Sequence, residues 1–596
     1  MRRCDYRHLI IICYFVRTPY EFISYGVMMV FSPWIIVVAI LIYMVSLFVI
    51  AQMAERRAAT GKNWANSAIV YSFAIFSSQW GSWAYYGSPN TIIEHGLSAY
   101  SILITMNMSL IFGRTVLKRA IKLKDLYKIT SIADFISARY GKSQIIAIIV
   151  TSITIFSTIP ILAAYIRVIS ETSTLITNIS DNHSLVSSSI RPIVVVSMIL
   201  FTVILGMRRL DPTERHPGIV VAMASESVIR LVAWLVVSLF VVLVLFGGIE
   251  GLHTQLSKGL LSATGLIPKT TTEQICIWLT YAVLGIVLFS SSPKIFYLTV
   301  IENNDQKHIS TAMWLYPLKV WLLGIFLLPI SLAGMLYCPK EILADKYLLS
   351  LPLQYGQGMI SLLVFMGGFS IATGLIIVET VTIATMLCNH LLIPIIENCR
   401  WIWSLRRHLL VCRWIAAAIL ILVGYWFEVS VGKSTALSNL GIIALSACLI
   451  YAPVLLIGLF WQRANKMGTI IGLSSGVLVW LYVMVTPVLA KTGIINPSIL
   501  TNGPLGLPFL RPTALFGLTG LPFLTNAVLW VLIFTIVPYV LGSLLYIPSS
   551  EESRLAEEFV GKASTLGYVD QGEANITLSE KEQELEAVLS RYYPAS

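Results

Sequence analysis

Polar residues interrupt an apolar stretch of the chain, YSFAIFSSQWGSWAYYGSPN, from Tyr71 to Asn90. At mid-span, its serines, glutamine and glycine would present carbonyls, hydroxyls and one amide to the middle of a membrane if the helix unwound there. Such backbone is tolerated in a bilayer only where it is buried in protein or lines a cavity. Discontinuous helices of this kind form the solute and ion sites of secondary transporters. The alternative is a kinked helix that packs closely through small residues, and this stretch alone favours neither.

Charged residues also occur inside apolar stretches, where each costs about 2 to 3 kcal/mol or more at mid-bilayer and so marks a functional candidate. Glu226 and Arg230 are four residues apart on one helical face, which predicts an ion pair or a gate near the cytoplasmic end of a span. Glu379 has no basic residue near it in the sequence. Either it accepts a proton during transport, or hydroxyls such as those of Thr380 and Thr382 and groups on other helices hold it.

A second small-residue segment, GGFSIATG, covers residues 367–374. Its paired glycines permit close helix approach, and Ser370 and Thr373 face the same way. Hydroxyls beside free carbonyls suit a small, hard cation. The alternative is that these hydroxyls bond back to their own helix. Gly285 and the SSSP run that ends at Pro293 are further weak points, where a second broken helix would occur if the fold repeats.

Composition identifies the elements that must position these residues. The 596 residues are 57% hydrophobic and 12% charged, which indicates a polytopic, all-α membrane protein. Runs of about 18 or more mostly apolar residues predict thirteen spans. They lie near 34–53, 65–87, 97–117, 145–169, 191–208, 224–247, 274–292, 312–336, 358–388, 410–427, 437–461, 467–489 and 525–546.

The positive charges indicate which loops face the cytoplasm. The net charge is +11, but no soluble basic domain carries it, so nucleic acid is not an expected partner. The basic residues gather in the loops after spans 1, 3, 5, 9 and 11, which are therefore cytoplasmic. With this topology the basic residues at 2, 3 and 7 would lie outside. Residues 1–28 are therefore expected to be an N-terminal extension, and 29–548 the transmembrane domain.

The last segment, 549–596, changes composition sharply. Ten acidic residues against four basic ones give it a charge of −6. Its end, SEKEQELEAVLSRYYP, has helical spacing, but forty-eight residues bury little core on their own. We expect an acidic cytoplasmic tail.

Several longer segments of the sequence resemble those of a known family. SSQWGSWAYYGSP, TSIADFISARYG and GGFSIATG are similar to segments of the sodium/solute symporter family. GMRRLDPTERHPG, TGLIIVETVTIATMLCNHLLIP and GPLGLPFLRPTALFGLTGLPFLTNAVLW resemble a branch in which such a domain is the sensory part of a bacterial histidine kinase. The resemblance implies a leucine-transporter-type fold in which spans 2–6 and 7–11 are inverted repeats. It also implies a bacterial inner membrane location, and that the acidic tail is a truncated linker of the kind that leads to the kinase.

The resemblance also implies site residues. The family's sodium site would use carbonyls of Ser77, Trp80 and Phe369 and the hydroxyl of Thr373, with Ser370 as a further candidate. A second hydroxyl position is Ala372, and the proline symporters' Asp is Gln79 here. Both departures weaken the expected cation affinity, so proton coupling, facilitated passage and binding without transport stay open.

The sequence therefore predicts a protein that binds a small organic solute, an amino acid such as proline or histidine, between two broken helices. Gln79, Trp80, Ser82 and Trp83 are the expected solute contacts. The first hypothesis is alternating-access transport coupled to Na+ or H+, with Glu226, Arg230 and Glu379 as coupling or gating residues. The second is a solute sensor that signals to a separate kinase or response regulator. No autokinase activity is expected, because neither a phosphoacceptor His motif nor a glycine-rich nucleotide lid occurs in the sequence. No other enzyme activity, other cofactor or other metal is expected.

Overall fold

The computed structural model describes residues 31–177, 185–206, 216–257, 271–303, 305–431 and 437–564. The predicted N-terminal extension and the tail beyond residue 564 lie outside the described residues.

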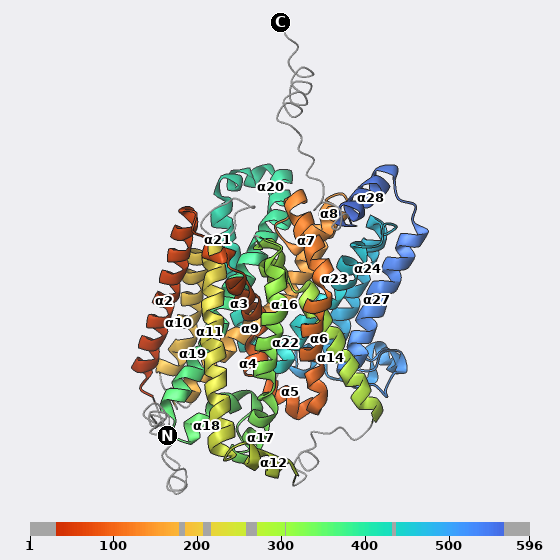
Figure 1. Cartoon of the computed structure of the whole chain (residues 1–596). Helices are drawn as coiled ribbons and strands as arrows, with labels where there is room; N and C mark the ends of the chain where they lie inside the picture. Colours follow the sequence, from red (N-terminus) through yellow and green to blue (C-terminus); the bar gives the residue numbers. More distant parts are fainter. Residues whose placement is uncertain are drawn as a thin grey trace, which may run out of the picture.

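Most of the described residues are helical (Figure 1), and each of the thirteen predicted spans coincides with a helix or a pair of helices. Eleven described helices are long and apolar enough to cross a membrane, and two shorter apolar helices, Ala68–Gln79 and Val194–Ile204, occupy predicted spans 2 and 5. The spans are α2 (Pro33–Ala59), α3 (Ala68–Gln79) with α4 (Ser82–Tyr85), α6 (Tyr100–Phe112), α9 (Gln144–Thr177), α10 (Leu185–Gly206), α11 (Pro217–Phe240), α14 (Thr271–Ser291), α16 (His308–Gly324) with α17 (Leu327–Tyr337), α19 (Gly358–Leu387), α21 (Leu409–Ser430), α22 (Leu437–Ser446) with α23 (Cys448–Gly458), α24 (Lys466–Trp480) and α27 (Phe523–Leu545).

Shorter helices connect the spans or cover their ends. They include α5 (Ser88–His95), α7 (Arg114–Tyr127), α8 (Ile132–Arg139), α12 (Ile249–Ser257), α15 (Pro293–Phe296), α18 (Tyr347–Gln354), α20 (Ile393–Asn398), α25 (Thr486–Lys491), α26 (Ser498–Asn502) and α28 (Ser550–Ser564). In Figure 1, α7, α8, α20 and α28 lie at one end of the bundle, which we call the basic end. It is the end that the sequence assigns to the cytoplasm.

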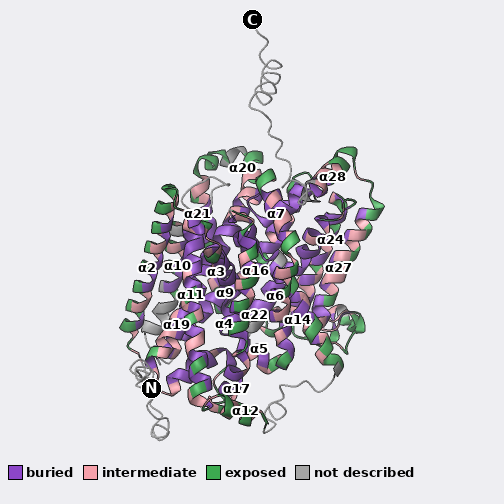
Figure 2. Cartoon of the chain, viewed as in Figure 1, coloured by how far each residue is buried: buried purple, intermediate pink, exposed green. Residues whose placement is uncertain are grey.

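The centre of the bundle is built from helices that are buried on several sides. α11 packs against α2, α3 and α19, while α9 packs against α19, α21 and α22. Figure 2 shows buried residues concentrated there and exposed ones on the rim helices α2 and α27. The exposed rim residues are large and apolar, for example Trp34, Ile42 and Leu545. A lipid-facing surface of this kind is expected of a multi-pass membrane protein.

The segment TSIADFISARYG, which follows span 3, forms α8, and this helix is docked at the basic end. Ser131 caps the helix by accepting a hydrogen bond from the Asp134 N–H, and Gly141 follows its end with a φ of +66°. Arg139 donates to the carbonyls of Gly458 and Trp461, at 3.0 Å each. These bonds satisfy the carbonyl of Gly458, the last residue of α23, and one in the turn that follows the helix.

Glycines bring α24 and α27 into direct backbone contact. Gly468, Gly472 and Gly476 follow each other every four residues, so they lie on one face of α24. A Cβ at Gly472 would lie 2.7 Å from the Tyr539 Cβ and 2.9 Å from the Thr535 carbonyl oxygen. Small residues at this spacing are a common means of packing membrane helices, because dispersion contacts and not hydrophobic exclusion hold them together.

We predict that Gly472→Leu separates α24 from α27 and lowers the free energy of unfolding by about 2 kcal/mol, as overpacking of a filled interface does. Thermal melting in detergent measures the effect. Gly520→Leu is the control, because nothing lies within 4 Å of a Cβ built there. Equal melting temperatures for the two variants would contradict the packing account.

Candidate functional site

Predicted span 2 is broken at Trp80 and Gly81. α3 ends at Gln79, Gly81 has extended backbone (φ −79°, ψ −172°), and α4 begins at Ser82. The side chains of Gln79, Trp80 and Ser82 are buried. The Tyr316 hydroxyl donates to Gln79 Oε1. Gln79 Nε2, Trp80 Nε1 and Ser82 Oγ have no hydrogen-bond partner among the described residues. The break therefore collects unpaired polar groups in the interior.

Trp83, the fourth predicted solute contact, lies on α4 and is buried. It packs tightly on α22, where a Cβ at Gly441 would lie 2.8 Å from the Trp83 Cβ. α4 itself rests on α19 through the predicted glycine pair. A Cβ at Gly367 would lie 2.6 Å from the Tyr85 hydroxyl, and one at Gly368 would lie 2.2 Å from the Tyr86 hydroxyl. The glycines thus leave the room in which the second half of the broken helix packs.

Predicted span 7 is broken at Ser292, directly before Pro293, which begins α15. Gly285, the other weak point named from the sequence, lies inside α14 and not at the break. Its role is close packing, because a Cβ there would lie 2.2 Å from Thr105 Oγ1 on α6. Proline preceded by an extended residue accounts for the position of the break.

A buried ion pair connects this second break to α19. Lys294 Nζ lies 2.9 Å from Glu379 Oε1 and donates to the Tyr165 hydroxyl at 2.8 Å. Tyr165 in turn faces the first break, since a Cβ at Gly81 would lie 3.7 Å from its hydroxyl. The hydroxyls of Thr380 and Thr382, expected from the sequence to hold Glu379, bond back to carbonyls of α19 itself.

Lys294 and Tyr165 are not among the candidate site residues predicted from the sequence. The signal for Lys294 was present, because a lysine directly after the SSSP run is a charge next to a predicted break. Nothing in the sequence pairs it with Glu379, which is eighty-five positions away.

The Glu226 and Arg230 side chains are fully buried. Arg230 Nη1 donates to the Ser77 carbonyl at 2.8 Å and to the Trp80 carbonyl at 3.0 Å. Glu226 Oε1 accepts from the Tyr43 hydroxyl at 2.8 Å, and its Oε2 lies 3.9 Å from Arg230 Nη2. The predicted ion pair is present. Its predicted place near the cytoplasmic end of the span is wrong, because the pair lies against the first break.

The predicted cation ligands on α19 also have protein partners. Ser370 Oγ donates to the Gly367 carbonyl at 2.7 Å, which is the alternative considered for this hydroxyl. Thr373 Oγ1 lies 3.1 Å from the Phe369 carbonyl oxygen and 3.2 Å from Glu226 Oε1. The structure thus brings Ser77, Trp80 and Thr373 together around the Glu226–Arg230 pair.

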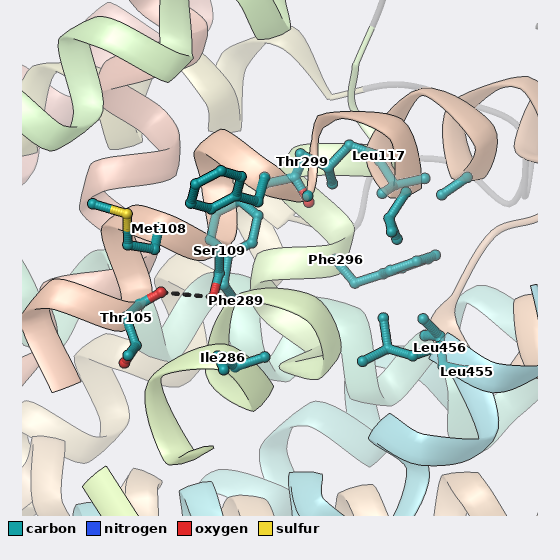
Figure 3. Close-up of a pocket in the computed structure, with 15 residues that line it drawn as sticks. Thr105, Met108, Ser109, Leu117, Ile286, Phe289, Phe296, Thr299, Leu455 and Leu456 are labelled. Atoms are coloured by element: carbon teal, nitrogen blue, oxygen red, sulfur yellow. Dashed lines mark hydrogen bonds between the residues drawn. The ribbon is translucent and has the colours of Figure 1, made fainter. Parts of the chain in front are cut away.

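An apolar pocket of about 290 Å³ lies apart from these residues (Figure 3). Its walls come from α6, α7, α14, α15, α23 and the turn after α15, and include Met108, Leu117, Phe289, Phe296 and Leu455. The Ser109 hydroxyl there donates to the Thr105 carbonyl of its own helix. None of the predicted solute or cation residues lines this pocket.

Comparison with known proteins identifies the fold. No family model matches the sequence. No curated protein matches it either. Among solved structures, the chain is similar to a Na+-coupled sialic acid symporter in a substrate-bound outward-open state. The TM-score is 0.59 with 12% identity over 86% of this chain and 98% of that chain. A second similar structure is Mhp1, a nucleobase-cation-symport-1 family transporter in a closed conformation with bromovinylhydantoin bound. There the TM-score is 0.40 with 10% identity over 83% of this chain and 95% of that chain.

The protein is therefore an all-helical, multi-pass membrane protein with the leucine-transporter-type fold of two inverted five-span repeats. Spans 2 and 7, the first of each repeat, are the broken pair. This confirms the predicted fold class.

We predict that Lys294→Met destabilises the protein by about 3 kcal/mol, because it leaves the Glu379 carboxylate buried without its partner. The double variant Lys294→Met/Glu379→Leu is expected to recover most of this loss, since apolar residues of similar volume replace the pair. Lys346→Met is the control, because the Lys346–Glu171 pair is partly exposed at 3.6 Å and contributes about 1 kcal/mol or less. Thermal melting in detergent measures these effects. A lower melting temperature for the double variant than for Lys294→Met would contradict the prediction.

Proposed function

We propose that this protein moves a small organic solute across a membrane by alternating access, with the solute bound between the two broken helices. The observation that carries the proposal is the meeting of two interrupted helices in the bundle interior, where buried polar groups gather. In transporters, half-helix ends and unwound backbone at such a position recognise the charged and polar groups of the solute. The leucine-transporter-type fold, shared with a Na+-coupled sialic acid symporter, supports the same function.

The buried groups favour a zwitterion, so we propose an amino acid, such as proline or histidine, as the solute. Lys294 and Glu379 place one positive and one negative group 2.9 Å apart beside the second break. A carboxylate approaching Lys294 and an ammonium approaching Glu379 would exchange one ion pair for two, so neither buried charge would be left uncompensated. Gln79 Nε2 and Ser82 Oγ, unpaired among the described residues, would supply the remaining hydrogen bonds. Trp80 and Trp83 complete the proposed contact set.

Uptake of labelled amino acids into proteoliposomes tests the proposal. Saturable uptake by the wild type is the expected result. The double variant Lys294→Met/Glu379→Leu is expected to fold but to lose uptake by about tenfold or more, because both charged solute contacts are gone. Lys346→Met serves as the control and should transport normally. Wild-type protein that neither binds nor accumulates any amino acid, or a double variant with full uptake, would refute this function.

One observation favours a second function, that of a solute sensor that signals to a separate kinase or response regulator. The tail helix α28 packs on α7 and α8. Its Phe559 is buried, with ring centroids 5.5 Å from Tyr127 and 6.1 Å from Phe135. Phe135 also lies 5.2 Å from Phe296, which is two residues beyond Lys294. A chain of aromatic contacts thus runs from the second broken helix to the tail.

If the tail reports solute binding, a spin label at Glu557→Cys, an exposed position on α28, should change mobility when solute is added. The label requires replacement of the native cysteines. Phe135→Ala should abolish the response while uptake persists, because it interrupts only the aromatic chain. If label mobility does not change with a solute that the protein takes up, the sensor function is eliminated and the transporter function remains.

A further inference from the structure

The backbone carbonyls released by the first break have a cationic partner within the chain. A break in a membrane helix frees carbonyl oxygens that the next turn would otherwise bond. Here two of them, at Ser77 and Trp80, accept hydrogen bonds from the same nitrogen, Arg230 Nη1, at 2.8 and 3.0 Å. The family resemblance assigns these two carbonyls, together with that of Phe369, to a bound cation, and the Phe369 carbonyl accepts a hydrogen bond from Thr373 instead. The guanidinium thus occupies the position where that cation would lie.

An acidic group balances the guanidinium from the same helix. Glu226 is one turn before Arg230 on α11, and both side chains are fully buried. Its carboxylate reaches α2 through Tyr43 and α19 through Thr373, the predicted ligand hydroxyl that this chain retains. Gly374 provides the space, because a Cβ there would lie 1.8 Å from Glu226 Oε2. Any larger residue at 374 would displace the carboxylate.

The neighbouring residues are consistent with a position already filled by protein. Ala372, at the second hydroxyl position, offers no ligand, and the Ser370 hydroxyl is donated to its own helix. A small cavity of about 10 Å³, lined by Glu226, Met223 and Gly374 among others, lies beside the pair. A space of this size holds one water molecule at most. The cluster therefore contains a cation, its counter-charge and little free space.

We propose that Arg230 is a built-in substitute for a coupling sodium ion, so that this protein works without Na+. The inference rests on the proposed transport function. The guanidinium holds the broken helix to α11, and through Glu226 to α2 and α19, which is the kind of contact a bound cation would make. Because a side chain cannot leave the protein, a sodium gradient cannot drive transport through this position. The solute then moves down its own gradient, by exchange, or with another ion bound elsewhere.

Sodium-dependent stability tests the proposal without any knowledge of the solute. An ion that binds the folded state and not the unfolded state stabilises the protein by RT ln(1 + [ion]/Kd), so it raises the melting temperature. The purified wild type is expected to melt at the same temperature in NaCl and in KCl of equal ionic strength. Arg230→Ala uncovers the two carbonyls and leaves the Glu226 carboxylate to be neutralised. This variant is expected to melt higher in NaCl than in KCl.

Two controls separate substitution for a cation from ordinary stabilisation. Arg139→Ala also removes a guanidinium from backbone carbonyls, at the basic end, and should destabilise the protein equally in both salts. Arg230→Lys retains a cation that can donate to both carbonyls, and should remain indifferent to sodium. If Arg230→Ala yields no folded protein, Arg230→Ala/Glu226→Gln removes the buried negative charge too, and a smaller sodium response is expected of it.

The proposal is overturned if sodium raises the wild-type melting temperature, or if the folded variant that lacks Arg230 shows no sodium response. Uptake provides the second measurement. Wild-type uptake should be equal in sodium, potassium and choline. Uptake by Arg230→Ala should be about tenfold or more faster in sodium than in potassium or choline. Wild-type uptake that needs sodium would overturn the substitution and leave transport intact. Absence of uptake under every condition would refute transport, while the melting temperatures would still decide the role of Arg230.

Discussion

The structure depends on one constraint, which is that a backbone carbonyl in the middle of a membrane must have a partner. Breaking span 2 at Trp80 and Gly81 releases carbonyls where no bulk water is available to hydrate them. The nearest solution in this chain is Arg230 on α11, whose own charge then needs Glu226. The Glu226 carboxylate in turn accepts a hydrogen bond from the Tyr43 hydroxyl and occupies space that the absence of a side chain at Gly374 leaves. One interrupted helix thus determines side chains on three other helices.

Close packing allows these charges to be buried at all. The glycines at 367 and 368 admit the hydroxyphenyl rings of Tyr85 and Tyr86, so α4 lies directly on α19. With the backbones this close, the interior excludes the water that would otherwise weaken the ion pairs. Glycines also allow close packing at the periphery, where the glycine face of α24 packs against α27. Small residues therefore position both the site and the scaffold around it.

The sequence predicts most of the fold because each span carries its own signal. Length and hydropathy are local, so all thirteen spans correspond to helices, and the Ser-Gln-Gly cluster marks the first break. At the second break, the proline signal is correct and the glycine signal at Gly285 is wrong. Glycine allows a break and close packing equally, and only the neighbouring α6 decides between them.

Pairing between spans could not be predicted. Glu379 has no basic neighbour along its own helix, and its partner Lys294 belongs to a different span, so their contact exists only after the two helices have packed. Arg230 shows the same limit more clearly. Spacing correctly paired it with Glu226, four residues before, but could not show that the guanidinium also reaches the carbonyls of Ser77 and Trp80, about 150 residues before it. Resemblance assigned those carbonyls to a cation, and the cation present is a side chain.

The two buried cations differ in what they hold, and this difference suggests different roles. Arg230 donates to backbone carbonyls, which a break in a helix exposes for as long as the break persists. Exchanging that partner would require the helix itself to rewind. Within the part of the chain that the structure describes, Lys294 donates only to side chains, those of Tyr165 and Glu379. These side chains rotate about single bonds and can be replaced one by one by groups on a ligand. Arg230 is therefore suited to fix the geometry of the first break, and Lys294 is suited to release its partners when a solute arrives at the second.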